Sequence, residues 1–185
     1  MRGVVDSVDA VARRERFEAL ASALIEPLRR YLARRTDAAS ADDVLAETLL
    51  VCWRRFEELP DEPLPWAYGV ARHCLANARR GVRRQERLAA RVAAVDPPVA
   101  TVPGPGGDDG PDLAAALAAL TQDDAELLRL WAWEQLGPSE IATVLDITPN
   151  AASIRLHRAR ERLREQLRKN PARAGHEESN EGRFR

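Results

Sequence analysis

The sequence predicts an all-α protein with two small helical domains joined by a flexible linker, the second a helix-turn-helix domain. Several segments repeat apolar residues every three or four positions, which is typical of amphipathic helices. Aromatic residues make up only 5% of the 185 residues while alanine and leucine dominate, a composition that favours helices. One stretch rich in proline and glycine interrupts the helical pattern and divides the chain.

The first domain is expected over residues 1–94 and contains three helices. The first helix has an apolar face from Phe17 to Leu32, and Pro27 inside that pattern is expected to kink or break it. Ser40 is the expected cap of a second helix that ends near Phe56, with two aspartates in its first turn. A third helix is expected from about residue 65 to about residue 91.

The second half of that third helix is strongly basic. Residues 72–91 hold seven arginines and only one acid, Glu86. Residues 151–169 hold seven basic residues against two acids, whereas residues 101–150 hold nine acids and only Arg129. The whole chain has a net charge of only −1, but two basic patches fit two contacts with a phosphate backbone. Solvated helix faces balanced by acids elsewhere remain the alternative for either patch alone.

Residues 95–111 are the expected linker. They contain five prolines and four glycines and offer little apolar surface to bury. An ordered loop packed on a domain is the alternative. The tail, residues 170–185, is polar and is expected to be disordered.

The second domain is expected over residues 112–169. A short helix to about Leu120 precedes a helix that Thr121 caps and that runs to about Gln135. Residues 137–160 then have the form of a helix-turn-helix. Pro138 suits a first helical turn, Asp146 tolerates the left-handed turn conformation, and Thr148 is a good N-cap for the second helix.

The second helix of this motif separates an inward stripe from a polar face. The inward stripe is Ala152, Leu156, Ala159, Leu163 and Leu167. Arginine can bond guanine bidentately, asparagine can bond adenine, and an apolar side chain can contact a thymine methyl group. An ordinary helical hairpin with a salt-bridged face is the alternative. The predicted base-facing residues are Asn150, Ser153, Ile154, Arg155 and Arg158.

Other classes of function find little support in the sequence. Cys52 and Cys74 lie in helical apolar patterns and are expected to be buried thiols, and the three histidines are scattered. We therefore expect no metal, no cofactor and no enzymatic activity, since no nucleophile–base pair or phosphate loop has the required spacing. No apolar run is long enough for a bilayer, and the first 16 residues are unlike a signal peptide, so no membrane insertion and a cytoplasmic location are expected.

The order of these parts resembles the bacterial RNA polymerase sigma factors of the small extracytoplasmic-function (group 4) class. The resemblance is carried by residues 42–56 (DDVLAETLLVCWRRF), 65–80 (PWAYGVARHCLANARR) and the helix-turn-helix continued to residue 164. It implies a protein that binds core RNA polymerase, recognises the −10 and −35 promoter elements and directs transcription initiation. It also implies an anti-sigma factor as a possible partner.

The resemblance assigns roles to particular residues. It implies polymerase contacts on the helix that starts near Asp42, −10 contacts on the basic third helix, and −35 contacts on the helix-turn-helix. The loop at residues 58–62 would help to hold a flipped −10 base. Packing of Trp53, Trp66 and Tyr68 in the core is the alternative for these aromatic residues. The implied polymerase-binding residues are Asp43, Glu47, Trp53 and Arg54, and the implied −10 residues are Trp66, Tyr68, Asn77, Arg79, Arg80, Arg83 and Arg84.

The chain departs from the family pattern at a few positions. Ala46 stands where the family usually has glutamine, and the turn at residues 146–148 reads Asp-Ile-Thr where Gly-Ile-Ser is favoured. Ser153 replaces a frequent lysine, and Ile154 replaces a frequent serine. These changes alter the surface that faces the groove, so the −35 sequence does not follow from the resemblance.

Two rival functions share part of this pattern. A helix-turn-helix regulator that acts without joining polymerase would give residues 42–56 no role. A helical adaptor protein would not bind DNA at all. Binding to core polymerase and binding to DNA separate the three possibilities.

Overall fold

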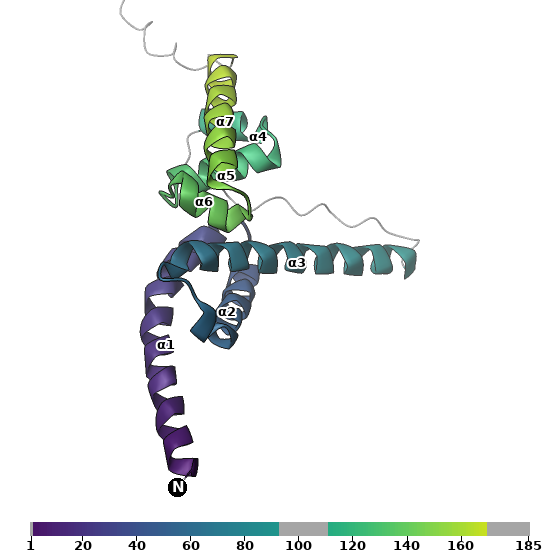
Figure 1. Cartoon of the computed structure of the whole chain (residues 1–185). Coiled ribbons are helices and arrows are strands. Elements are labelled where there is room, and N and C mark those ends of the chain that lie inside the picture. The colour runs from purple at the N-terminus through teal and green to yellow at the C-terminus, as the bar shows by residue number, and fades with distance from the viewer. Residues whose placement is uncertain (1, 93–110, 170–185) are drawn as a thin grey trace, which may run out of the picture.

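The structure is a computed structural model that describes residues 2–92 and 111–169, with side chains for residues 10–87 and 113–169 (Figure 1). The described residues form helices and no strand, which confirms the all-α prediction. The tail and residues 95–110 of the expected linker lie outside the described residues, and Pro111 begins a helix instead of ending the linker. The helices are α1 (Arg2–Ala33), α2 (Ala38–Arg54), α3 (Pro63–Val92), α4 (Pro111–Ala118), α5 (Gln122–Ala132), α6 (Pro138–Leu145) and α7 (Pro149–Lys169), with a short 3₁₀ turn η1 (Phe56–Glu58).

Helices α1, α2 and α3 pack together into what we call the first unit, residues 2–92. Helix α1 continues through Pro27, so of the expected kink or break the break is wrong, and the helix begins at Arg2, well before its apolar pattern. Leu28 and Leu32 are fully buried and continue the same inner face past the proline. Packing of this face therefore holds the helix together although Pro27 supplies no backbone N–H.

The start of α2 corrects a second expectation. Asp37, not Ser40, is the N-cap: its carboxylate accepts hydrogen bonds from the Ser40 amide at 3.0 Å and from the Ser40 hydroxyl at 2.7 Å. These hydrogen bonds hold the pKa of Asp37 below its ordinary value. The helix consequently starts at Ala38 and its two following aspartates lie beyond the first turn. At its other end α2 stops at Arg54, and Phe56 belongs to η1.

The second unit, residues 111–169, contains α4 to α7. The Thr121 hydroxyl accepts a hydrogen bond from the Asp124 amide at 3.2 Å, which confirms the predicted cap. Helix α5 ends at Ala132 instead of Gln135, because Gln135 has a left-handed φ of 56°. The predicted turn between α6 and α7 is confirmed, with Asp146 at φ 53° and the Thr148 hydroxyl accepting from the Ala151 amide at 3.2 Å.

The inward stripe of α7 is shorter than predicted. Ala152, Leu156 and Ala159 are buried, but Leu167 is 41% exposed. In the last turns of α7, Gln166 and Lys169 face α4 in place of Leu167. The stripe shifts because α4 lies beside the end of α7 at an angle that the spacing of leucines does not encode (Figure 1).

The two units are in direct contact, which the sequence did not predict. Helix α6 lies against the N-terminal half of α3 (Figure 1), and the buried apolar residues of both units form one continuous cluster. At the contact, Gly69 of α3 faces the backbone of α6. A Cβ atom at Gly69 would lie 3.4 Å from the Val144 carbonyl oxygen, so even the smallest side chain at this position would be in van der Waals contact with the backbone of α6.

Candidate nucleic-acid interface

The recognition surface on α7 is open to solvent. All five predicted base-facing residues are exposed, and Ile154 is 44% exposed although it is apolar. The buried stripe on the opposite side of α7 packs against α5 and α6, which fixes the direction in which this face points. Helix α7 can therefore enter a major groove without rearrangement of the second unit.

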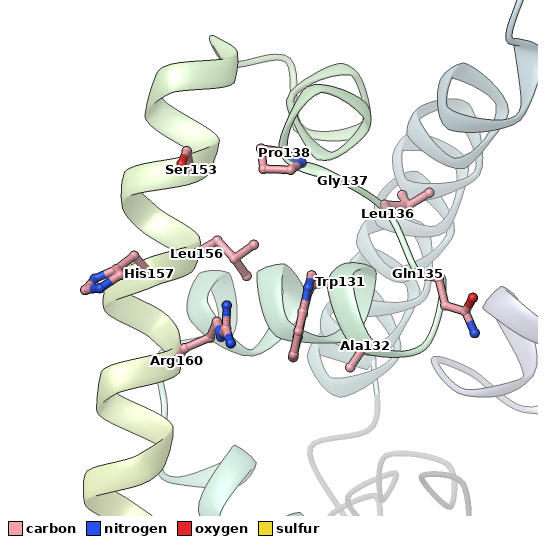
Figure 2. Close-up of a pocket in the computed structure, with 10 residues that line it drawn as sticks. All are labelled: Trp131, Ala132, Gln135, Leu136, Gly137, Pro138, Ser153, Leu156, His157 and Arg160. Carbon is pink, nitrogen blue, oxygen red and sulfur yellow. The ribbon is translucent and has the colours of Figure 1, made fainter.

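A shallow groove of about 720 Å³ borders this surface on the side of Ser153 (Figure 2). It lies between α7 and the segment that connects α5 to α6, and its lining includes His157 and Arg160 but no carboxylate. The guanidinium of Arg160 lies 4.5 Å from the ring centre of Trp131, which is 40% exposed. The groove thus places one arginine, Arg160, next to the predicted base-facing residues.

The second predicted DNA surface lies along α3. Asn77, Arg79, Arg80, Arg83 and Arg84 are all exposed, and the later turns of α3 extend away from the other helices (Figure 1). Two of these arginines already have protein partners: Arg80 donates to the side-chain oxygen of Asn77, and Arg79 donates to the carbonyl oxygen of Arg35. The first contact holds the Arg80 guanidinium against α3 itself, and the second holds the Arg79 guanidinium against the residues that follow α1.

The aromatic members of the −10 set differ from the arginines. Tyr68 is only 3% exposed, and its ring centre lies 5.0 Å from that of Tyr31. Burial, with a smaller effect from Glu134, raises the pKa of Tyr68 to about 12. Trp66 is half-buried at the edge of the core. In this arrangement Tyr68 packs inside the molecule, so its −10 role remains a prediction that requires its release.

The predicted polymerase surface is on α2. Asp43, Glu47 and Arg54 are exposed, whereas Trp53 is half-buried. The Trp53 ring centre lies 5.0 Å from that of Phe17. The Arg13 guanidinium lies 4.3 Å from the Trp53 ring centre, and it also donates a hydrogen bond to the Trp53 carbonyl oxygen at 3.0 Å. Trp53 therefore has the partly buried position that allows either a core role or a docking role.

Metal and thiol chemistry have no candidate site among the described residues. No group of three or more histidine, cysteine or acidic side chains comes together there. Cys52 and Cys74 are buried free thiols, and burial raises the pKa of Cys52 to about 11 and also raises that of Cys74. Both sulfurs are therefore protonated at neutral pH. None of the described helices is both long and apolar enough to span a membrane.

Sequence reasoning missed one group of charged residues, which joins the two units. Arg35 lies just after α1, and its side chain is 6% exposed between Glu126 of α5 and Glu134 of the connection between α5 and α6. Arg34 pairs with the other oxygen of Glu134 at 3.3 Å. We call Arg34, Arg35, Glu126 and Glu134 the inter-unit ion-pair network. The acidic character of residues 101–150 was its only sequence signal, since helical periodicity does not pair distant charges.

Comparison with known proteins agrees with this geometry. Residues 112–163 match the family model of sigma-70 region 4. The extracytoplasmic-function (ECF) RNA polymerase sigma factor SigL of Mycobacterium tuberculosis is 31% identical over 140 residues, which cover 73% of this chain and 79% of SigL.

Two solved structures share the fold. The first is the sigma factor RpoE of Bartonella quintana in complex with the anti-sigma factor NepR, with a TM-score of 0.57 and 21% identity over 83% of this chain and 98% of that one. The second is CnrH in complex with the cytosolic domain of CnrY, also with a TM-score of 0.57 and 21% identity, covering 85% of this chain and 90% of that one.

The predicted family is thus confirmed by identity over most of the chain, and the rival regulator is not favoured. The exposed recognition helix, the arginine-bearing α3 and the relatives agree. The chain belongs to the ECF class of RNA polymerase sigma factors, which bind core RNA polymerase and recognise the −10 and −35 promoter elements to direct transcription initiation.

Proposed function

We propose that the chain divides this work between its two units, with residues 112–169 reading the −35 element, residues 1–94 holding polymerase and the −10 element, and a linker between them that ends before Pro111. The observation that carries the proposal is that all five base-facing residues on α7 are exposed, within the part that matches sigma-70 region 4. Two tethered binding surfaces also gain affinity from their effective concentration on one promoter.

At the −35 element, Arg155 and Arg158 are the leading base or phosphate contacts. Asn150, Ser153 and Ile154 set the sequence preference from the first two turns of α7. A small serine and an apolar isoleucine at adjacent exposed positions favour contact with a thymine methyl group over a further bidentate contact. Arg160, in the groove beside Ser153, is suited to a phosphate that flanks the bases.

At the −10 element, the strand that is opened must be held unpaired. The arginines along the projecting part of α3 suit its phosphates, and Trp66 and Tyr68 offer aromatic faces for unstacked bases. Because Tyr68 is buried beside Tyr31 in this arrangement, its ring becomes available to a base only when it is released from the core.

On the polymerase side, exposed acids and an arginine flank the half-buried Trp53 on α2. Reversing the charge of Glu47 to lysine, or of Arg54 to glutamate, is expected to weaken capture of core polymerase while the helical content stays unchanged. The exposed Glu18 on α1, which pairs with Arg14 on the same helix, provides a matched control position. Unchanged capture by both variants would remove α2 from the polymerase interface.

Three further assignments complete the proposal. The chain acts in the cytoplasm, where polymerase and promoters are, and it binds without catalysing a reaction itself. An anti-sigma factor holds it inactive, by analogy with the complexes of RpoE and CnrH. A co-purified inhibitory protein that covers both units would support this last assignment.

Run-off transcription tests the whole proposal. Purified chain and core polymerase are mixed with a library of promoter templates that vary independently at −10 and −35. Transcripts should depend on the chain and on both elements. DNA binding without chain-dependent transcripts would instead favour a regulator that never joins polymerase.

A further inference from the structure

The early turns of α1 reach across to the end of α2. Arg13 donates a hydrogen bond to the Trp53 carbonyl oxygen at 3.0 Å, and its guanidinium lies 4.3 Å from the Trp53 ring centre. One turn later, Phe17 meets the rings of Trp53 and Phe56 edge to face, at 5.0 Å and 5.7 Å between ring centres. Among the residues of α1 with described side chains, the first buried one is Leu24. The part of α1 before its buried face therefore packs on the end of α2 and on η1.

Two arginines of α1 share the carboxylate of Glu57, the middle residue of η1. The Glu57 Oε1 atom lies 3.3 Å from the Arg13 Nε atom and 3.5 Å from a terminal nitrogen of Arg16. The Arg16 guanidinium also lies 5.6 Å from the ring centre of Phe56. We call Arg13, Arg16 and Glu57 the Glu57 anchor. It fastens η1 to a helix other than the one that precedes η1 in the chain.

The Glu57 anchor is too exposed to contribute much to the stability of the whole protein. The side chains of Arg16 and Glu57 are 62% and 60% exposed, and exposed ion pairs add little to the free energy of unfolding. Its effect falls on η1, because none of the residues of η1 is buried and Arg55 gives it no side-chain cap within the described part of the chain. The backbone hydrogen bond from the Leu59 amide to the Phe56 carbonyl oxygen is also long, at 3.4 Å. A turn with so little other support takes its position from the contacts of Phe56 and Glu57.

The segment that η1 positions is the loop that leads to α3. Residues 59–62 separate η1 from the start of α3 at Pro63, and they belong to the stretch for which the family resemblance implies contact with a flipped −10 base. Residues 60–62 are exposed, whereas Pro65 in the first turn of α3 is buried. Burial of α3 thus fixes one end of the loop, and the Glu57 anchor fixes the other. Since only residues 59–62 separate the two fixed ends, the loop has little conformational freedom to lose when a base binds.

We propose that Arg13 and Arg16, acting through Glu57, are positioning residues for −10 recognition: they hold residues 59–62 in the conformation that accepts the flipped base. The proposal rests on the proposed function, because the loop acts on a base only if the first unit binds the −10 element. None of the three anchor side chains needs to touch DNA. Their loss should therefore lower selectivity among bases and leave the number of phosphate contacts unchanged.

Three variants separate the anchor from its surroundings. Glu57→Gln removes the shared charge and leaves the contacts of Arg13 with α2 in place. Arg16→Ala removes one partner of Glu57, whereas Arg16→Lys keeps a cation there and is the conservative rescue. Arg14→Ala is the matched control, because Arg14 lies on the same helix and pairs with Glu18 of α1. Thermal unfolding reports the global stability of each variant, which should change little.

Hydrogen exchange of the free chain measures the positioning directly. The amides within residues 58–62 should exchange about two- to ten-fold faster in Glu57→Gln and Arg16→Ala than in wild type, because partly exposed ion pairs supply no more than this. Arg16→Lys and Arg14→Ala should exchange as the wild type does, and the amides in the middle of α2 should be unaffected in all variants. Equal exchange in wild type and Glu57→Gln would show that the anchor does not hold the loop, and would overturn the proposal without reference to DNA.

Binding of forked promoter DNA by the chain with core polymerase measures the consequence. The fork has a duplex −35 element and a single-stranded −10 element, in which each base is changed in turn to the other three. At the most selective −10 position, Glu57→Gln and Arg16→Ala should lose about two- to ten-fold of the wild-type discrimination, whereas Arg16→Lys and Arg14→Ala should keep it. The slope of affinity against salt should stay at the wild-type value in every variant.

Two results with forked DNA would overturn the positioning role. The first is undiminished discrimination by Glu57→Gln. The second is a shallower salt slope for Arg16→Ala, which would make Arg16 a direct phosphate contact. A wild type that binds all fork sequences equally would overturn the proposed −10 role of the first unit itself, and this proposal with it, even if the exchange rates change as expected.

Discussion

Helices α7 and α3 carry similar sets of exposed arginines, but their predicted DNA-binding side chains differ in how many contacts they make with the rest of the protein. On α7 the five base-facing residues are all exposed and lie opposite a buried stripe of the same helix. On α3, Tyr68 is buried, Arg79 binds the carbonyl oxygen of Arg35, and Arg80 binds Asn77. The recognition surface on α7 is set by packing within its own unit and is exposed in this structure. The surface on α3 lies at the contact between the units, and several of its side chains are already buried or bonded to other parts of the protein.

The largest expected effect is on −35 binding by the exposed surface of α7. Replacing Arg155 by alanine should cost about 1–3 kcal/mol of −35 binding and relax preference at one base pair, since this side chain is exposed and faces solvent. Fluorescence anisotropy with duplexes mutated one position at a time measures it. Arg164→Ala, whose side chain pairs with Glu161 near the end of α7, is the control. An equal loss on every duplex would make Arg155 a phosphate contact.

On the shared surface, the Arg79→Ala and Arg80→Ala double variant should open promoters less well and show a shallower salt dependence. Each lost phosphate contact on a single strand removes about 0.7 from the log–log slope. The single variants sharpen the comparison, because Arg79 also contacts Arg35 while Arg80 contacts only its own helix. A wild-type slope in the double variant would take both arginines off the DNA.

A smaller effect is expected at the cap of α7. Thr148→Ala removes the acceptor of the Ala151 amide and should lower stability by about 1 kcal/mol, with fraying at Asn150 and a modest loss of −35 binding. Thr148→Ser keeps the hydroxyl and should restore both. Thermal unfolding and anisotropy on the same samples measure the two effects. Equal stability of the alanine and serine variants would show that the hydrogen bond contributes nothing.

The smallest expected effect is a loss of stability of the first unit at alkaline pH. This unit holds both tyrosines and both cysteines of the chain. Burial raises the pKa of Cys52 to about 11 and that of Tyr68 to about 12, so the folded state holds these protons more tightly than the unfolded state. Their stabilising contribution is complete below about pH 9 and is lost as pH rises through those values. Thermal unfolding between pH 8 and pH 11 should show the decline, and Cys52→Ala should make it shallower. A midpoint that stays constant up to pH 11 would contradict it.

Sequence reasoning succeeded where structure is local. The N-cap at Thr121 and the left-handed turn at Asp146 were predicted correctly, because capping and left-handed turns depend on one or two neighbouring residues. It failed where partners are distant: packing carries α1 through Pro27, and α4 decides which side of the last turns of α7 is buried. The Asp37 cap was missed because aspartate and serine are equally good capping residues, so residue type alone does not select between Asp37 and Ser40.

By itself the sequence determined the helical fold, the helix-turn-helix with its exposed basic face, and the family, because periodicity, capping and motif order are properties of neighbouring residues. Only the tertiary structure decided that Arg35 meets Glu126 and Glu134, that Gly69 faces α6, and that Tyr68 is covered. These pairs lie tens of residues apart, and nothing in local spacing specifies which distant charge or backbone will approach. The exposed surface on α7 could therefore be predicted from the sequence, whereas the state of the surface on α3 could be known only from the folded chain.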